Sequence, residues 1–115
     1  MDKQALLKAV VKAAEDKLAQ DIVVLNLQGI ALFADYFVIC HGNSELQVQA
    51  ISKAIKEEAE KQGVEAKMTE GYEQARWVLI DLGEIVVHVF HKEEREYYNL
   101  EKLWVDATRV EVGGH

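Results

Sequence analysis

The stretch RWVLIDLGEIVVHVF, residues 76–90, decides the fold, because it contains two apolar segments separated by Leu82-Gly83. Glycine supplies the positive φ that a tight hairpin turn requires at little cost. The stretch therefore predicts a β-hairpin whose loop is residues 82–83. The predicted cross-strand pairs are Asp81–Glu84, Ile80–Ile85, Leu79–Val86, Val78–Val87 and Trp77–His88.

Side chains alternate between the two faces of a hairpin. One predicted face is wholly apolar and is expected to join the core; it carries Val78, Ile80, Ile85, Val87 and Val89. The other face mixes large apolar groups with polar ones, and it carries Trp77, Leu79, Asp81, Glu84, Val86, His88 and Phe90. Two interpretations of this second face are open. Either a helix covers it as a second core, or it is an exposed patch that binds a protein through aromatic anchors.

The composition indicates a single domain. A chain of 115 residues can bury enough surface to fold without a metal or a disulfide, and its one cysteine, Cys40, suits a reducing compartment. No apolar run reaches the roughly 18 residues of a membrane-spanning helix, and the N-terminus does not resemble a targeting peptide. We therefore expect a cytoplasmic protein.

The charge of the chain restricts its partners. Twenty acidic residues outnumber 13 basic ones, which gives a formal net charge of −7. Nucleic-acid binders neutralise phosphates with Lys and Arg and are usually basic. Little direct contact with nucleic acid is therefore expected, whereas a basic protein partner would be favoured by complementary charge.

Apolar periodicity predicts the element order α-β-β-α-β-β-β-α, which is typical of an α+β domain with a mixed sheet and helices packed on it. Residues 1–107 are expected to form the domain and residues 108–115 a flexible tail. The predicted helices span residues 2–19, the segment from a Ser44 cap to a stop at Gly63, and residues 92–104, and the predicted strands span 21–27, 35–41, 64–68 and the two arms of the hairpin.

No group of residues in the sequence predicts an active site or a metal centre. His88 and His91 have a spacing seen in metal sites, but residues three apart on a strand point to opposite faces. Residues 42–44 precede a capped helix and could cradle a phosphate, although no Walker lysine accompanies them. Asp81 and Glu84 flank a turn, where carboxylates are usually solvated. No cofactor is expected.

Three segments carry a resemblance to a known family. They are DYFVIC with the following GNS (residues 35–44), WVLIDLGEIVVHVF (77–90) and YNLEKLW (98–104). In this order, over roughly residues 4–107, the chain resembles the ribosomal silencing factor (Iojap) family. The combination of Trp-x3-Asp-x-Gly, a histidine in the next strand and the closing Leu-Glu-x-Leu-Trp is specific to that family.

The resemblance implies a non-catalytic factor that binds the large ribosomal subunit at the L-fourteen ribosomal protein. There it would block joining of the small subunit and lower translation when nutrients are short. The residues that we expect at the partner surface are Trp77, Leu79, Asp81 and His88, with Phe90 and Tyr98 beside them.

Two alternatives remain open from the sequence. The family's fold is similar to that of nucleotidyltransferases, so a minimal nucleotide-binding enzyme that uses Gly42, Ser44 and Asp81 is the rival hypothesis. The paired metal-binding aspartates of those enzymes are missing, because Leu82 and Gly83 follow Asp81. The aromatic face could also form a homodimer when the protein is free.

Overall fold

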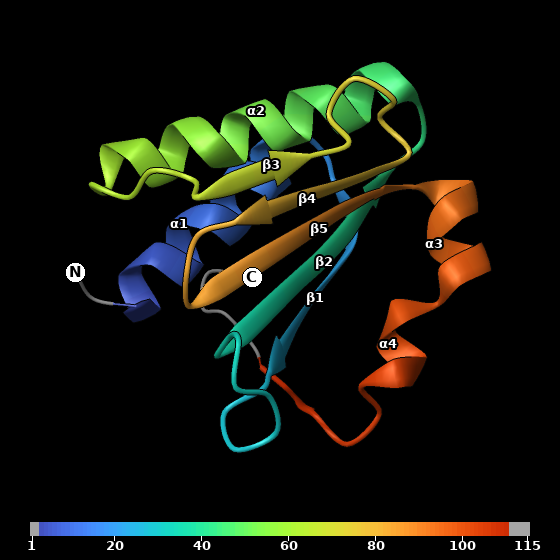
Figure 1. The fold of residues 1–115 in the computed structure, drawn as a ribbon. Helices are drawn as coiled ribbons and strands as arrows, with labels where there is room; N and C mark the ends of the chain where they lie inside the picture. The colour runs from blue at the N-terminus through green and yellow to red at the C-terminus, as the bar shows by residue number, and fades with distance from the viewer. Residues whose placement is uncertain (1–2, 111–115) are drawn as a thin grey trace.

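The computed structural model describes residues 3–110, which form one α+β domain around a mixed six-stranded sheet (Figure 1). The strands lie in the order β3-β4-β5-β2-β1-β6. The elements are α1 (Lys3–Asp16), β1 (Gln20–Asn26), β2 (Tyr36–Gly42), α2 (Glu45–Lys61), β3 (Met68–Glu70), β4 (Trp77–Asp81), β5 (Ile85–His91), α3 (Lys92–Tyr98), α4 (Leu100–Leu103) and β6 (Thr108–Arg109).

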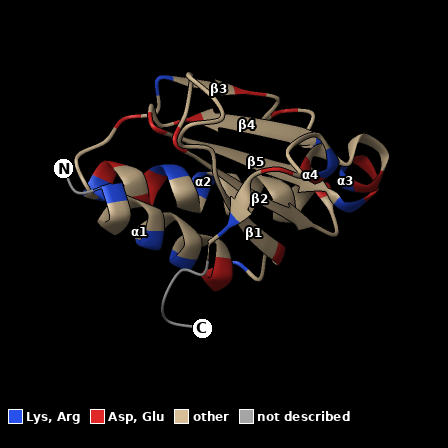
Figure 2. Cartoon of the chain, turned by 90° about the horizontal axis from the view of Figure 1, so that it is seen from below, with Lys and Arg blue, Asp and Glu red and all other residues tan. Residues whose placement is uncertain are grey.

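The central strands β2 and β5 are parallel, whereas every other pair in the sheet is antiparallel. Their register runs from Tyr36 opposite Ile85 to Gly42 opposite His91. Every residue of β2 is buried, as is β5 up to Phe90. Figure 2 shows both strands without a single Lys, Arg, Asp or Glu, as burial on both faces requires.

Helices cover both faces of this sheet (Figure 1). Helices α1 and α2 pack against each other and against the face that holds the main core. Helices α3 and α4 lie on the opposite face, over a smaller core that includes Phe37, Ile39, Phe90 and Leu100. The second hairpin face is thus partly covered, so the sequence-based interpretations of a second core and an open patch each describe part of it. The strand residues of the main core are Val24, Tyr36, Val38, Cys40, Val78, Ile80, Ile85, Val87 and Val89.

The hairpin forms, but its predicted register is wrong by one residue at the turn. The Leu82 N–H donates to the Ile85 carbonyl at 2.9 Å, so residues 83–84 are the loop. The Asp81 carboxylate accepts from the Gly83 N–H at 2.8 Å and fixes this turn. Each cross-strand partner therefore shifts by two positions, which leaves every side chain on its predicted face. The observed pairs are Trp77–Phe90, Val78–Val89, Leu79–His88, Ile80–Val87 and Asp81–Val86.

The predicted ends of α2 are confirmed. The Ser44 hydroxyl accepts from the Gln47 N–H at 3.1 Å, while the Gln47 side chain accepts from the Asn43 N–H at 2.8 Å. At the other end Gly63 has a φ of 85°. The next amide, that of Val64, bonds back to the Ala59 carbonyl, which completes a Schellman ending.

Three predicted segments differ in the structure. The strand predicted over 64–68 is instead the short edge strand β3 at Met68–Glu70. The single helix predicted over 92–104 is broken at Asn99, whose left-handed φ of 46° ends α3 and precedes α4. Within the predicted tail, Thr108–Arg109 pairs with β1 as β6, and residues 111–115 lie outside the described part of the chain.

Gly71 determines how the chain re-enters the sheet before β4. Its φ is 82°, and a Cβ built on it would lie 2.1 Å from the Trp77 carbonyl oxygen. Gly29 has nearly the same φ, 83°, but an added Cβ there meets no atom within 4 Å. An alanine at position 29 would therefore add only backbone strain, whereas an alanine at position 71 would add the same strain and a steric clash.

We expect Gly29→Ala to lower the free energy of unfolding by about 1 kcal/mol, the cost of a left-handed alanine. Gly71→Ala adds a clash with backbone and should cost about 3 kcal/mol in total. Urea unfolding of the two variants measures the difference. Equal losses would show that the loop at residue 71 relaxes freely.

Candidate functional site: an aromatic surface over β4 and α3

Trp77 is the centre of the candidate surface. It opens β4 and is half-buried between two other rings, because Phe90 lies beneath it on β5 and Tyr98 lies beside it at the end of α3. The indole centroid is 4.9 Å from the centroid of each of these rings. The structure therefore brings three predicted site residues into one aromatic cluster with tilted rings.

His88 fixes the orientation of the indole. The Trp77 Nε1–H donates to Nδ1 of His88 at 3.1 Å. Since an indole N–H can only donate, Nδ1 must be the unprotonated nitrogen, and the histidine proton is on Nε2. Nε2 is buried and has no hydrogen-bond partner among the described residues. Burial lowers the pKa of His88 from its ordinary value of 6.5 to about 4, so the ring is neutral at physiological pH.

The predicted site residues divide into supporting and accessible groups. His88 is 4% exposed and Phe90 is 0% exposed, so both support the surface from below and do not reach a partner in this conformation. Leu79 and Asp81 are partly exposed along β4, and Tyr98 is 46% exposed. The accessible surface consists of Trp77, Leu79, Asp81 and Tyr98, and we call it the aromatic surface.

Sequence reasoning missed two exposed apolar residues, one beside the aromatic surface and one on α4. Tyr97 is 80% exposed and packs edge-on against Tyr98 at 5.0 Å, and Leu103 on α4 is 73% exposed. Helical spacing places Tyr97 in a buried stripe only if one helix continues through residue 99. The left-handed Asn99 breaks that continuity and leaves the tyrosine in solvent. An asparagine before Leu100 was the available signal.

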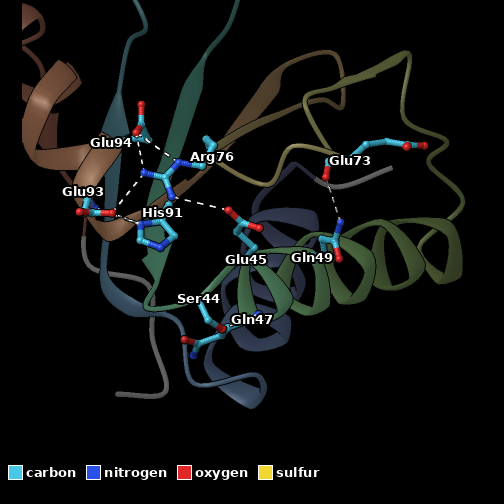
Figure 3. A network of polar contacts seen from close by, with 9 residues as sticks. All are labelled: Ser44, Glu45, Gln47, Gln49, Glu73, Arg76, His91, Glu93 and Glu94. Carbon is cyan, nitrogen blue, oxygen red and sulfur yellow. Dashed lines mark hydrogen bonds and ion pairs between the residues drawn. The ribbon is translucent and has the colours of Figure 1, made fainter.

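Arg76 fastens α3 beside the aromatic surface (Figure 3). Its Nη2 lies 2.8 Å from Glu94 and 3.2 Å from Glu93, both in the first turn of α3. Its Nη1 lies 3.7 Å from Glu45 at the start of α2. The hydrogen bonds that Arg76 donates to Glu94 and Glu93 raise the pKa of its guanidinium above the ordinary value. One guanidinium therefore joins β4 to helices on both faces of the sheet.

Groups that could support chemistry are dispersed. Among residues 3–110, no cluster of three or more His, Cys, Asp or Glu could hold a metal ion, and no helix could span a membrane. Cys40 is fully buried in the main core, and desolvation raises the pKa of its thiol to about 12. His91 caps α3 through its Nδ1, which accepts from the Glu93 N–H at 3.2 Å.

The burial of His88 predicts a pH dependence of stability. The folded state disfavours the proton on His88, so the unfolded chain binds more protons between pH 6.5 and about 4. The contribution of His88 to the free energy of unfolding is fully present above pH 6.5. It falls by about 3 kcal/mol as the pH is lowered to about 4. His88→Phe should remove this part of the slope. His41, whose pKa is also lowered, is present in both proteins and cancels in the comparison. If urea titrations show the same dependence of unfolding free energy on pH for His88→Phe and the unchanged protein, the lowered pKa of His88 is refuted.

Comparison with known proteins identifies the family of this chain. The sequence model described as "Ribosomal silencing factor during starvation" matches residues 1–114. The ribosomal silencing factor of Halalkalibacterium halodurans is 63% identical over 114 residues, covering 99% of this chain and 97% of that protein. The ribosomal silencing factor of Bacillus subtilis is 58% identical, covering 97% of this chain and 95% of that protein. A crystal structure of a Chromobacterium violaceum protein, 30% identical, matches with a TM-score of 0.89 and covers 100% of this chain and 95% of that chain. The chain therefore belongs to the ribosomal silencing factor family.

Proposed function

We propose that this silencing factor acts in the bacterial cytoplasm by binding the large ribosomal subunit at the L-fourteen ribosomal protein. In that position it sterically blocks joining of the small subunit and represses translation when nutrients are limiting. The observation that carries the proposal is the half-buried Trp77, whose ring contacts Tyr98 at a tilt and donates a hydrogen bond to His88. Family membership supports the ribosome as the target.

The aromatic surface has the properties of a protein-binding site. Its central ring is already fixed by a hydrogen bond and by packing on Phe90, so little rotamer freedom is lost on binding. Large aromatic side chains of this kind dominate the energy of protein interfaces. Asp81 at its edge can meet a Lys or Arg, and the net charge of −7 favours a basic partner. When the factor is free, a second copy of the chain could cover the same surface.

The three residues that the rival hypothesis of a nucleotide-binding enzyme requires do not lie together. Gly42 is the last residue of β2 and Ser44 follows it, whereas Asp81 ends β4 opposite Val86. Val86 in turn pairs with Phe37 near the start of β2. About five residues of strand, or about 16 Å, therefore separate Asp81 from the glycine turn. These residues do not form one site, and occlusion requires no reaction.

The proposed block of subunit joining can be measured directly. Excess protein added to purified subunits should reduce the joined ribosome peak in a sucrose gradient, with the factor co-sedimenting with large subunits only. An undiminished joined peak at saturating protein would exclude the steric mechanism. Binding to large subunits without any effect on joining would retain the target and refute the block.

The exposed Tyr98 tests the aromatic surface with little risk to the fold. Tyr98→Ala should weaken binding to large subunits by about 2 kcal/mol, or roughly thirtyfold, as loss of an interface anchor does. Tyr72 is the matched control, because it is 36% exposed and lies outside the aromatic surface, in the segment between β3 and β4. Tyr72→Ala should bind as the unchanged protein does. Equal affinities for all three proteins would place the binding surface elsewhere.

A further inference from the structure

A second site lies where the two parallel strands end. Strands β2 and β5 run side by side, and at their carboxyl ends the chain leaves toward opposite faces, into α2 from β2 and into α3 from β5 (Figure 1). In open sheets with parallel strands, ligands bind in the crevice that such a divergence creates. A cavity of about 780 Å³ occupies this place, on the α3 side of the sheet. We call it the strand-end pocket.

Two buried nitrogen-rich side chains line the strand-end pocket. Arg95 of α3 is 8% exposed and His41 of β2 is 7% exposed. The Arg95 Nη1 donates to His41 Nδ1 at 2.9 Å and to the Gln20 carbonyl at 3.3 Å, and its Nε donates to Glu101 at 3.1 Å. The guanidinium is thus held rigidly by three separate segments of the chain.

These bonds leave hydrogen-bond donors free at the pocket. A guanidinium has five N–H groups, and within the described residues no partner is recorded for the two on Arg95 Nη2. Because Arg95 can only donate, His41 Nδ1 must accept, so the proton of the neutral imidazole is on Nε2. Desolvation and the neighbouring guanidinium lower the pKa of His41, which keeps the ring neutral. The buried wall of the pocket therefore carries donors aimed at no protein acceptor.

The rim contains both signs of charge. Lys92 and Arg109 are exposed cations that line it, and Asp21 and Glu96 are exposed carboxylates. The third carboxylate, Glu101, is already engaged by Arg95 and lies 3.8 Å from Arg109. Arg95 at the buried wall is therefore paired through Nε with Glu101, but its Nη2 donors are not.

Unusual backbone conformations shape the same pocket. Asp21, beside a register shift in β1, has a φ of 45°, and Asn99 between α3 and α4 has a φ of 46°. Both residues line the cavity. Aspartate and asparagine adopt the left-handed conformation more readily than other residues that carry a Cβ. These two turns therefore shape the wall of the pocket.

We propose that the strand-end pocket binds a small ligand through an oxyanion, either a phosphate or a carboxylate group, received by Arg95 Nη2 and His41 Nε2 with Lys92 at the rim. The two N–H groups of Arg95 Nη2 are charge-assisted donors that suit the oxygens of either group. The site is distinct from the aromatic surface, and its existence does not depend on ribosome binding.

The test is an NMR titration of the ¹⁵N-labelled protein with inorganic phosphate and, separately, with acetate, at constant pH and ionic strength. The amides of His41, Asn43 and Arg95 should shift in a saturable manner with at least one of the two anions. Saturation by one anion alone identifies which oxyanion the pocket takes. Linear shifts spread over all surface amides with both anions would overturn the proposal.

Two variants connect the signal to the pocket. Lys92→Gln should weaken the saturating anion by about threefold, as loss of one exposed ion pair does, while Lys8→Gln, an exposed lysine on α1, should leave the affinity unchanged. Arg95→Lys keeps the charge but removes the Nη2 donors, and should weaken binding by about tenfold or more. Equal effects of Lys92→Gln and Lys8→Gln would refute the site even if the Arg95 variant fails to fold.

Discussion

The parallel pairing of β2 and β5 is the constraint on which the rest of this fold depends. Seven residue pairs align the two strands, and nearly all their side chains are buried. A strand buried on both faces forces the chain to supply cover on both, which α1 and α2 do on one side and α3 and α4 on the other. The same pairing separates the exits of the two strands, and that separation opens the strand-end pocket.

The sequence predicted the alternation of the hairpin and the ends of α2 because both are set by neighbouring residues. Its errors arose where one side chain selects between close alternatives. The Asp81 carboxylate bonds the Gly83 amide and moves the turn by one residue, which a count of apolar positions does not detect. Asn99 interrupts a convincing helical period in the same way, through its own backbone conformation. Apolar alternation and helical period thus predict the elements, whereas the side chain of Asp81 and the backbone of Asn99 determine where those elements turn or end.

The candidate site was predictable only in part, because burial depends on distant segments. Alternation placed Trp77, His88 and Phe90 on one face, and that was correct. How deeply each side chain is buried depends on where α3 and α4 lie, and no pattern in β4 or β5 predicts that position. Of the strand-end pocket, the sequence indicated only the segment of residues 42–44, which contributes Asn43 to the lining. The other walls come from β1, β2, α3, α4 and β6.

Helix α3 lies between the two surfaces, and it is held in an unusual way. Its one buried side chain is Arg95, so an apolar stripe does not anchor it. It is fixed by two guanidinium groups: Arg76 reaches the carboxylates of its first turn, and its own Arg95 reaches β1, β2 and α4. Hydrogen-bonded clamps of this kind set a position more sharply than apolar contact does, because they are directional. The pose of Tyr98 beside Trp77, and hence the shape of the aromatic surface, therefore depends on polar contacts that lie outside that surface.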